Sequence, residues 1–462
     1  MTDRNPVADP EIFKAYDLRG HYPDQLDEDL AYRLGRAFAR VLAEEEDKAP
    51  SELRVGLGHD MRPESPELSD RWADGLRDEG ADVLDIGEAA TEMVYFAVGS
   101  RGLDGGVAVT ASHNPKGYAG AKLVKSGAIA LSGDTGISDV QRHVEEGDMD
   151  EPADPRGDYQ REDIGEEFRE AALAFIDPER VRPMKVVLDG ANGMAGPMVG
   201  PVLDKLPLEQ VQAYWTPDGN FPGQDPNPLL EENQEFITNE VLEQGAELGI
   251  IWDGDADRCF FVDDTGQFVE GDFLTAVLAE SIVGKEPGAT ILYDIRASRA
   301  VRDTVERAGG TAHENRVGHA FFKSRMREEG AAFGGEVSGH YYFRDFYCAD
   351  SGTIPALLIL ELLSEKDQRM SELLAPLRES YFISGEINSE VEDQEGKMAE
   401  LEDRYSDGEI NKLDGVSIDY EDWHFTVRPS NTEPLLRLTL ESLVSPEHMA
   451  EKRDEVLSVI RS

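Results

Sequence analysis

Residues 53–87 read LRVGLGHDMRPESPELSDRWADGLRDEGADVLDIG, and this stretch indicates the fold class. The run at 53–58 has the apolar and β-branched residues of a strand. The segment 65–80 begins with serine and ends with glycine, which favour the start and the end of a helix. A second strand follows at 81–87. A strand, a helix and a strand in succession are typical of a sheet that is covered by helices.

The same alternation returns along most of the chain. Strand-like runs occupy residues 105–112, 184–190, 247–255, 289–295 and 331–343, with helical patterns between them. After residue 370 the strands become shorter, as in a small antiparallel sheet. Polar stretches without periodicity at 147–163 and 364–370 indicate linkers. The pattern therefore predicts α/β domains followed by a smaller α+β domain.

The chain carries 95 acidic against 45 basic side chains, a formal net charge of −50, and 13 of the basic residues are lysine. Such a polyanion repels nucleic-acid phosphates and anionic membranes, which argues against both as partners. Hydrophobic residues still make up 40%, so the chain can bury a core. Dispersed acid with little lysine is typical of a protein that works in very high salt, where screening removes the self-repulsion. We therefore expect a halophilic protein.

The chain has few features of a secreted or membrane protein. Cys259 and Cys348 are too few for a disulfide framework or a zinc site. The N-terminus MTDRNPVADP lacks the basic and apolar regions of a secretory signal. The apolar run IPALLILELL at 354–363 is too short to span a membrane and contains Glu361. We expect a soluble, cytoplasmic protein.

The segment VTASHNP at 109–115 leaves a predicted strand and turns. Ser112 would lie at the tip of this turn, where it could act as a nucleophile or carry a phosphoryl group. An ordinary turn serine is the competing interpretation. His113 is adjacent in sequence, so it is not automatically the base for Ser112.

The segment DGDADR at 253–258 follows an apolar strand and places Asp253, Asp255 and Asp257 on one tight loop. Three carboxylates so close together suit a hard cation such as Mg²⁺. In so acidic a chain the same spacing would arise by chance about four times. The position at a strand end and the small residues between the aspartates favour a metal site.

The segment GGEVSGH at 334–340 ends a predicted strand. Glu336, Ser338 and His340 occupy alternate positions, so in an extended chain they would point to one side. They could bind hydroxyl groups, with His340 as a candidate acid or base. An ordinary polar strand face is the alternative.

The segment RPSNTEP at 428–434 concentrates hydrogen-bond donors in one turn: Arg428, Ser430, Asn431 and Thr432. Such a turn could hold a phosphate dianion, and a simple capping turn is the alternative. The chain contains no Walker A loop and no G-x-G-x-x-G segment, so nucleotide binding has no support.

Together and in this order, the four motifs resemble the signature loops of the α-D-phosphohexomutase superfamily. FKAYDLRG at 13–20, PDGNFPGQDPNPLL at 217–230 and CADSGTIPALLILELL at 348–363 are also similar to bacterial-type phosphomannomutases. The resemblance covers nearly the whole chain. It implies three similar mixed-sheet α/β domains and a smaller C-terminal α+β domain around a central cleft. We place them at 1–153, 154–263, 264–372 and 373–462.

The resemblance also assigns roles to individual residues. Ser112 would carry the phosphoryl group and complete a Mg²⁺ site formed by Asp253, Asp255 and Asp257. The other catalytic residues would be Arg19, Lys122 and His340, with His340 or Lys122 as the base. Substrate would bind to Arg316, His319, Glu336 and Ser338, and its non-reacting phosphate to Arg428, Ser430, Asn431 and Thr432.

The implied activity is that of a Mg²⁺-dependent phosphomannomutase. It would interconvert mannose 1-phosphate and mannose 6-phosphate through a phosphoserine enzyme and a hexose 1,6-bisphosphate, and would also accept glucose phosphates. A main activity as phosphoglucomutase or phosphoglucosamine mutase is the alternative. A Mg²⁺-dependent sugar-phosphate phosphatase and a sugar-phosphate-binding protein without catalysis are rivals from other classes. We expect sugar phosphates as partners and a monomer or weak homodimer.

Three positions depart from the superfamily pattern. Ala119 stands where an asparagine is common before the Gly-x-Lys of the serine loop. Arg316 replaces the lysine of the Lys-x-Gly-His sugar loop, which keeps the charge and changes the geometry. Gly339 replaces an alanine that is frequent in close phosphomannomutases, so strict mannose specificity is not implied.

The charge predicts how the protein responds to salt. At 0.01 M ionic strength the Debye length is about 30 Å and carboxylates repel over long distances, whereas at 1 M it is about 3 Å. We expect thermal stability and turnover to rise together into molar KCl, measured by thermal unfolding and by a mutase assay in the same buffers. Equal stability and turnover at about 0.01 M and about 2 M KCl would contradict the halophilic interpretation.

Overall fold

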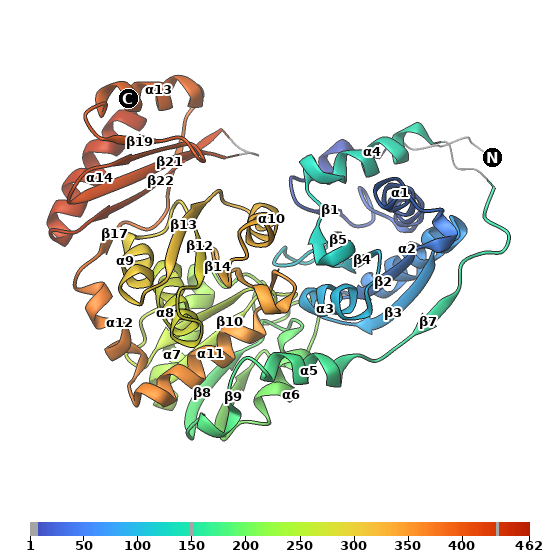
Figure 1. Cartoon of the computed structure of the whole chain (residues 1–462), viewed down its shortest axis with the longest axis horizontal. Coiled ribbons are helices and arrows are strands. Elements are labelled where there is room, and N and C mark those ends of the chain that lie inside the picture. The colour runs from blue at the N-terminus through green and yellow to red at the C-terminus, as the bar shows by residue number, and fades with distance from the viewer. Residues whose placement is uncertain (1–7, 148–150, 431–433) are drawn as a thin grey trace.

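The computed structural model describes residues 8–147, 151–430 and 434–462, which form four lobes that each contain one sheet (Figure 1). The N-terminal lobe lies at the right of the view, the second and third form the centre and base, and the C-terminal lobe stands at the upper left. The predicted architecture, three α/β domains and a smaller α+β domain, is confirmed.

The first sheet has the order β1-β5-β4-β2-β3-β7, with β6 paired to β5. β2 runs parallel to β3 and β4, whereas β5 is antiparallel to β1 and β4. Its strands are β1 Leu18–His21, β2 Arg54–His59, β3 Asp82–Glu88, β4 Gly105–Val109, β5 Tyr118–Lys125, β6 Ile129–Ala130 and β7 Tyr159–Arg161. The helices are α1 Glu28–Glu46, α2 Ser65–Asp78, α3 Thr91–Arg101 and α4 Ile137–Glu146. β7 pairs with β3, so this sheet extends past the boundary that we placed at 153.

The second and third sheets follow the same plan, with parallel strands and then an antiparallel strand that follows a short turn. The second contains β8 Met184–Asp189, β9 Leu208–Ala213, β10 Leu248–Trp252 and β11 Cys259–Asp263, with helices α5 Gly165–Leu173, α6 Ala195–Leu203 and α7 Glu231–Gln244. The third contains β12 Thr290–Asp294, β13 Thr311–Asn315, β14 Phe333–Gly335, β15 Tyr341–Phe343 and β16 Ala349–Asp350. The helices that follow the second sheet are α8 Gly271–Lys285, α9 Arg299–Arg307, α10 His319–Glu329, α11 Thr353–Lys366 and α12 Met370–Arg378.

The fourth sheet is antiparallel in the strand pairs of its described residues, as the shorter strands predicted. It contains β17 Phe382–Ile383, β18 Ile387–Glu390, β19 Glu409–Asn411, β20 Val416–Asp419, β21 Trp423–Pro429 and β22 Leu435–Ser442, with helices α13 Gln394–Arg404 and α14 Pro446–Ile460.

The apolar cores group the domains into a block and a separate unit. One continuous core joins α3 of the first domain to the second and third domains, and it includes Val94, Trp252 and Phe343. The fourth domain buries its own core around Phe425 and Leu438. The first three domains therefore share one apolar core, whereas the sheet of the fourth domain packs mainly against its own core, with Ile383 of β17 reaching the shared one.

The prediction of a single strand at 331–343 is wrong. Residues 331–343 form two antiparallel strands, β14 and β15, and not one continuous strand. The turn between them is closed by hydrogen bonds from the Glu336 amide to the His340 carbonyl and from the Gly339 amide to the Glu336 carbonyl. Gly339 has a φ of +89°, which only glycine adopts easily. The polar residues of this segment therefore lie on a turn and do not share one extended face.

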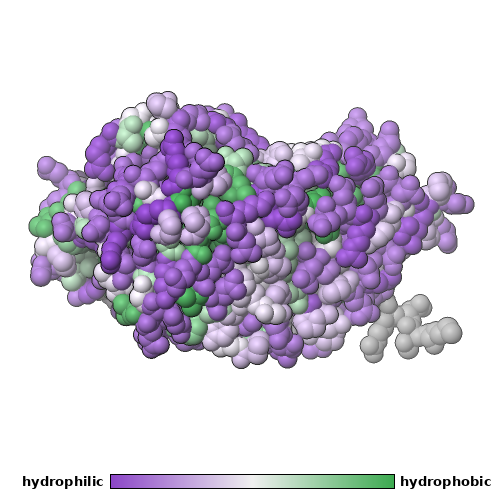
Figure 2. All heavy atoms as spheres, turned by 90° about the horizontal axis from the view of Figure 1, so that it is seen from below, coloured by the Kyte–Doolittle hydropathy of each residue, from purple (hydrophilic) through white to green (hydrophobic). Residues whose placement is uncertain are grey.

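The surface fits the composition. Hydrophilic residues cover most of the face seen in Figure 2, and the apolar residues on it form scattered patches. Across the described ranges, no helix is long and apolar enough to cross a membrane. Cys259 and Cys348 are buried and unpaired, in line with the absence of a predicted disulfide framework.

Glu92 of α3 connects the first domain to the start of α11 through hydrogen bonds. Its burial leads to a prediction about the dependence of stability on pH. Its buried carboxylate accepts hydrogen bonds from the hydroxyls of Ser351 and Thr353. Burial raises the pKa of Glu92 to about 7, although both hydroxyls favour the ionised form. In the unfolded chain Glu92 ionises at its ordinary pKa near 4.5. The free energy of unfolding therefore falls as the pH rises from about 4.5 to about 7, and it does not recover at higher pH.

Glu92→Gln removes this ionisation and keeps the side-chain size. We expect the melting temperature of the variant, relative to the wild type, to increase as the pH is raised from about 5 to about 8. Glu88→Gln, at an exposed position of the same domain, is the control and should show no such trend. A difference between Glu92→Gln and the wild type that stays constant over this pH range would contradict the prediction.

Candidate active site

A cleft of about 990 Å³ is lined by side chains from all four domains. Seven Lys or Arg side chains line it against four carboxylates, together with four histidines. The basic side chains are Lys14, Arg19, Lys122, Arg258, Arg296, Arg428 and Arg437. A basic cleft in a chain with a net charge of −50 concentrates anionic small molecules at one place.

Ser112 lies in the turn between β4 and β5 and is buried at the base of the cleft. Its φ of +51° is a left-handed conformation that is uncommon for serine. Its amide donates to Thr110 Oγ1 at 2.9 Å. Its hydroxyl donates to Asp253 Oδ2 at 3.2 Å and lies 3.3 Å from His113 Nδ1. The predicted phosphoryl carrier therefore faces the predicted metal loop.

The three aspartates of that loop lie in the turn between β10 and β11, and all are buried. Asp253 accepts a hydrogen bond from Arg258 Nε at 2.9 Å. Asp255 accepts from Lys122 Nζ at 2.7 Å, and Asp257 also pairs with Lys122. One oxygen from each carboxylate lies within 4.8 Å of the others. The structure thus brings together the residues that the spacing selected.

The serine turn and the aspartate turn touch backbone to backbone. A Cβ at Gly254 would lie 2.6 Å from the carbonyl oxygen of Ser112, so no larger residue fits. Gly193 meets the other side of the same turn, because a Cβ there would lie 2.4 Å from the Gly254 carbonyl oxygen. The amide of Met194 donates to that oxygen at 2.9 Å. Glycine at 254 allows the close approach of the two domains, and glycine at 193 allows close packing behind the aspartate turn within the second domain.

The carboxylate cluster fits a divalent cation. Oδ1 of Asp255 and Oδ1 of Asp257 are buried, and neither has a hydrogen-bond partner among the described residues. Burial raises the pKa of Asp253 and of Asp257, and neighbouring carboxylates add to both shifts. Burial also opposes ionisation of Asp255, but the Lys122 ammonium outweighs it and holds the pKa of Asp255 below its ordinary value. Oxygen ligands with unused lone pairs and mutual repulsion are what Mg²⁺ would neutralise.

Lys122 and Arg19 come from neighbouring strands, β5 and β1. Burial disfavours the charge on Lys122, but Asp255 and Asp257 outweigh it and raise the pKa of Lys122 above its ordinary range. Arg19 donates to Asp17 at 2.8 Å and to Asn114 Oδ1 at 2.5 Å. Both cations therefore lie close to the serine turn, where phosphoryl oxygens would be.

The third domain brings the two predicted histidines to the cleft, but not the other residues predicted there. His319 and His340 line it, whereas Arg316, Glu336 and Ser338 do not. Glu336 is buried and accepts hydrogen bonds from the Gly318 amide at 2.9 Å and from the Tyr342 hydroxyl. The guanidinium of Arg316 lies 4.1 Å from the centre of the Phe321 ring, and Ser338 Oγ lies 3.2 Å from His340 Nδ1.

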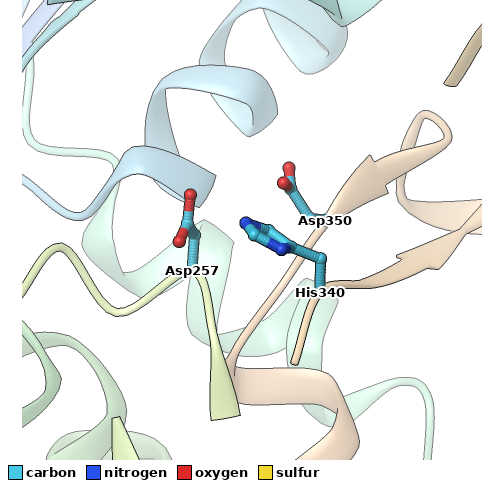
Figure 3. Close-up of side chains that lie close together, drawn as sticks. All are labelled: Asp257, His340 and Asp350. Carbon is cyan, nitrogen blue, oxygen red and sulfur yellow. The ribbon is translucent and has the colours of Figure 1, made fainter. Parts of the chain in front are cut away.

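His340 lies between two buried carboxylates (Figure 3). A nitrogen of His340 and oxygens of Asp257 and Asp350 lie within 4.8 Å of one another. Asp350 is itself paired with buried Lys323 at 2.8 Å. Burial lowers the pKa of His340 well below its ordinary value, although Asp350 opposes the shift. An uncharged imidazole in this position can accept a proton.

The fourth domain contributes Arg428 and Ser430 to the cleft. Arg428 pairs with Asp414 at 2.9 Å, and Asp414 also accepts a hydrogen bond from the Val317 amide at 2.9 Å. Asp414 thereby links Arg428 of the fourth domain to the turn of the third domain that precedes α10. The predicted residues Asn431 and Thr432 lie outside the described residues.

Several cleft residues were not predicted from the sequence. Arg258 directly follows Asp257, and Arg296 follows the strand end of β12, so strand-end position was an available signal for both. Arg437 is the cross-strand partner of Arg428 in β21 and β22. Two arginines in directly opposed positions repel each other, and an anion bound between them would relieve this. The other unpredicted lining residues include Tyr16 and Asp350.

Comparison with protein families matches all four domains. The phosphoglucomutase/phosphomannomutase domains I, II and III, each described as alpha/beta/alpha, match residues 10–151, 166–266 and 270–381. The C-terminal domain of the same family matches residues 386–459. The four matches follow the order of the four lobes.

Relatives that match nearly the whole chain belong to the same family. A phosphomannomutase from Salmonella montevideo is 42% identical over 458 residues, which are 97% of this chain and 99% of the relative. A phosphomannomutase from Escherichia coli K12 is 44% identical over 439 residues, 93% of this chain and 94% of the relative. The crystal structure of a phosphoglucomutase/phosphomannomutase family protein from Burkholderia thailandensis superposes with a TM-score of 0.87 at 31% identity, covering 97% and 96% of the two chains. The chain therefore belongs to the phosphoglucomutase/phosphomannomutase family and is an isomerase of the phosphohexomutase type.

Proposed function

We propose that this protein is a phosphomannomutase that interconverts mannose 1-phosphate and mannose 6-phosphate and also accepts glucose phosphates. The observation that carries the proposal is the 3.2 Å hydrogen bond from the Ser112 hydroxyl to Asp253, inside a cluster of three carboxylates at the base of a basic cleft. A hydroxyl beside a cation site suits phosphoryl transfer. The names of the relatives supply the sugar.

The reaction begins with a phosphoryl group on Ser112, supplied by a hexose 1,6-bisphosphate. The bond from phosphorus to Ser112 Oγ breaks while a bond to the free sugar hydroxyl forms, and the hydroxyl proton passes to His340. The resulting bisphosphate turns within the cleft, a bond forms from its other phosphorus to Ser112 Oγ while the bond from that phosphorus to the sugar oxygen breaks, and His340 returns the proton to this oxygen. Arg19 and Lys122 lie beside the serine turn and stabilise the phosphoryl oxygens.

His340 is the stronger candidate for the base. Lys122 is engaged by two carboxylates, which hold its proton. Among the described residues, the hydrogen-bond partner of His340 is the hydroxyl of Ser338. Because the bisphosphate turns within the cleft, each of its ends meets the same imidazole, and the same base can serve both half-reactions.

Asp253, Asp255, Asp257 and the phosphate on Ser112 would hold Mg²⁺. The bound cation would neutralise charge on the transferring group and make Ser112 a better leaving group. The unpartnered oxygens of Asp255 and Asp257 support this assignment.

The phosphate that does not react would be held by Arg428, Ser430, Asn431 and Thr432, and Arg437 lies opposite Arg428 in the sheet. Arginine donates two parallel hydrogen bonds to a phosphate, so a pair of arginines suits a dianion. The substrate presents a phosphate to this turn in either orientation, so the same grip serves both half-reactions.

The first arm of the test addresses the carrier. Ser112→Ala should reduce mutase turnover by several orders of magnitude and leave the fold intact, because the acceptor oxygen is lost. The assay couples product formation to a dehydrogenase in molar KCl, and mass spectrometry follows the phosphate on Ser112 after treatment with glucose 1,6-bisphosphate. Substantial turnover by the variant, with no adduct on the wild type, would contradict the proposal. Release of free phosphate without isomerisation would favour a phosphatase.

The second arm compares mannose, glucose and glucosamine 1-phosphates. Mannose and glucose differ at C2, and none of the four motifs has a residue that we assign to that position. Discrimination in kcat/KM should therefore be about 10–100-fold, the scale of one imperfect contact. Glucosamine phosphate should be the poorest substrate, because its ammonium group has no evident partner. A kcat/KM for glucose 1-phosphate more than about four decades below that for mannose 1-phosphate would show that a group in the cleft contacts the substituents at C2.

A further inference from the structure

Arg62 lies beneath the serine turn, with a side chain that is fully buried and does not line the cleft. Its guanidinium donates to four backbone carbonyl groups, three in that turn and one at the start of β5. One terminal nitrogen donates to Ser112 at 2.9 Å and to Asn114 at 2.6 Å, and the other to Pro115 at 3.1 Å and to Tyr118 at 3.3 Å. A single side chain therefore binds three carbonyl groups of the turn and the one at the start of β5.

These contacts address a specific difficulty of the turn. Residues 110–117 link two strands, and several of their carbonyl groups point inward, where buried acceptors need donors. Ser112 also holds a left-handed backbone conformation, which persists only when its surroundings enforce it. Thr110 fixes the Ser112 amide and Arg62 fixes the Ser112 carbonyl, so the peptide planes on both sides of the serine are held.

Arg62 is itself held from two sides. Asp60 accepts from its Nε at 3.3 Å and from its amide at 3.0 Å, and also from the Ser65 hydroxyl at 2.6 Å. On the other side the second domain covers it. The Phe221 ring centre lies 5.0 Å from the guanidinium carbon, and a Cβ at Gly219 would lie 2.5 Å from the Arg62 Cα. Contact with the second domain thus reaches the serine turn through Arg62.

We propose that Arg62 is a positioning residue for phosphoryl transfer. By binding the carbonyl groups of the turn it fixes the direction of the Ser112 hydroxyl toward the aspartate cluster, and it does so without touching substrate. Arginine is required because its planar fork reaches several acceptors at once, which a lysine ammonium on a flexible stem does not reproduce. The inference rests on the proposed role of Ser112 as phosphoryl carrier.

Arg62→Lys keeps the charge and removes the fork. A displacement of about 1 Å at a reacting group costs about 100-fold in rate, so we expect a loss of that size in kcat and in the rate of Ser112 phosphorylation by glucose 1,6-bisphosphate. KM for mannose 1-phosphate should stay within about threefold, because no substrate contact is lost. The matched control is Arg77→Lys in the same domain. Arg77 also donates to a backbone carbonyl, of Gly157 at 2.8 Å, and faces an aromatic ring, but it lies away from the cleft.

The results of these measurements distinguish a failure of the Arg62 inference from a failure of the proposed function. Phosphorylation and kcat of Arg62→Lys within about threefold of the control, or a KM that rises as kcat falls, would overturn the inference. A wild type that takes no phosphate on Ser112 would overturn the proposed function, and the Arg62 role with it. If Arg62→Lys does not fold, Asp60→Asn replaces it. That variant weakens the anchor of Arg62 and should lose about tenfold in kcat at unchanged KM, and full activity would overturn the inference.

Discussion

The carbonyl oxygen of Ser112 lies so close to Gly254 that a single added carbon would collide with it. This backbone contact brings the serine turn of the first domain to the aspartate turn of the second. It allows the Ser112 hydroxyl to reach Asp253 and Lys122 to reach Asp255 and Asp257. A site assembled from two domains depends on a fixed distance between them, and the continuous apolar core of the first three domains supplies that rigidity.

Each of the four motifs lies between two neighbouring antiparallel strands. The pairs are β4 and β5, β10 and β11, β14 and β15, and β21 and β22. In the first three of these pairs the short connection is held by a strand at each end and has little freedom, so the sheet fixes the position of its motif. The balance of acidic and basic side chains in the cleft differs from that of the whole chain. Carboxylates outnumber Lys and Arg in the whole chain, whereas Lys and Arg outnumber carboxylates among the residues that line the cleft.

The sequence was sufficient for the alternation of strands and helices, for the change to an antiparallel sheet after residue 370, and for the serine and aspartate motifs whose side chains lie together in the structure. These depend on local periodicity and spacing. The turn at Gly339 was missed because alternating polar residues also fit an extended strand. Arg62 and Arg437 were missed for another reason: their partners, the carbonyl groups beneath Ser112 and the opposed Arg428, are set by tertiary contacts and strand register.

The central claim is that Ser112 and the three aspartates form one site. Electron–nuclear double resonance on enzyme that has been primed with glucose 1,6-bisphosphate and loaded with Mn²⁺ in place of Mg²⁺ tests it most directly. We predict one tightly bound Mn²⁺ per chain, with a hyperfine coupling to phosphorus that is absent in Ser112→Ala. Bound Mn²⁺ that shows no phosphorus coupling, although mass spectrometry finds phosphate on Ser112, would contradict the claim.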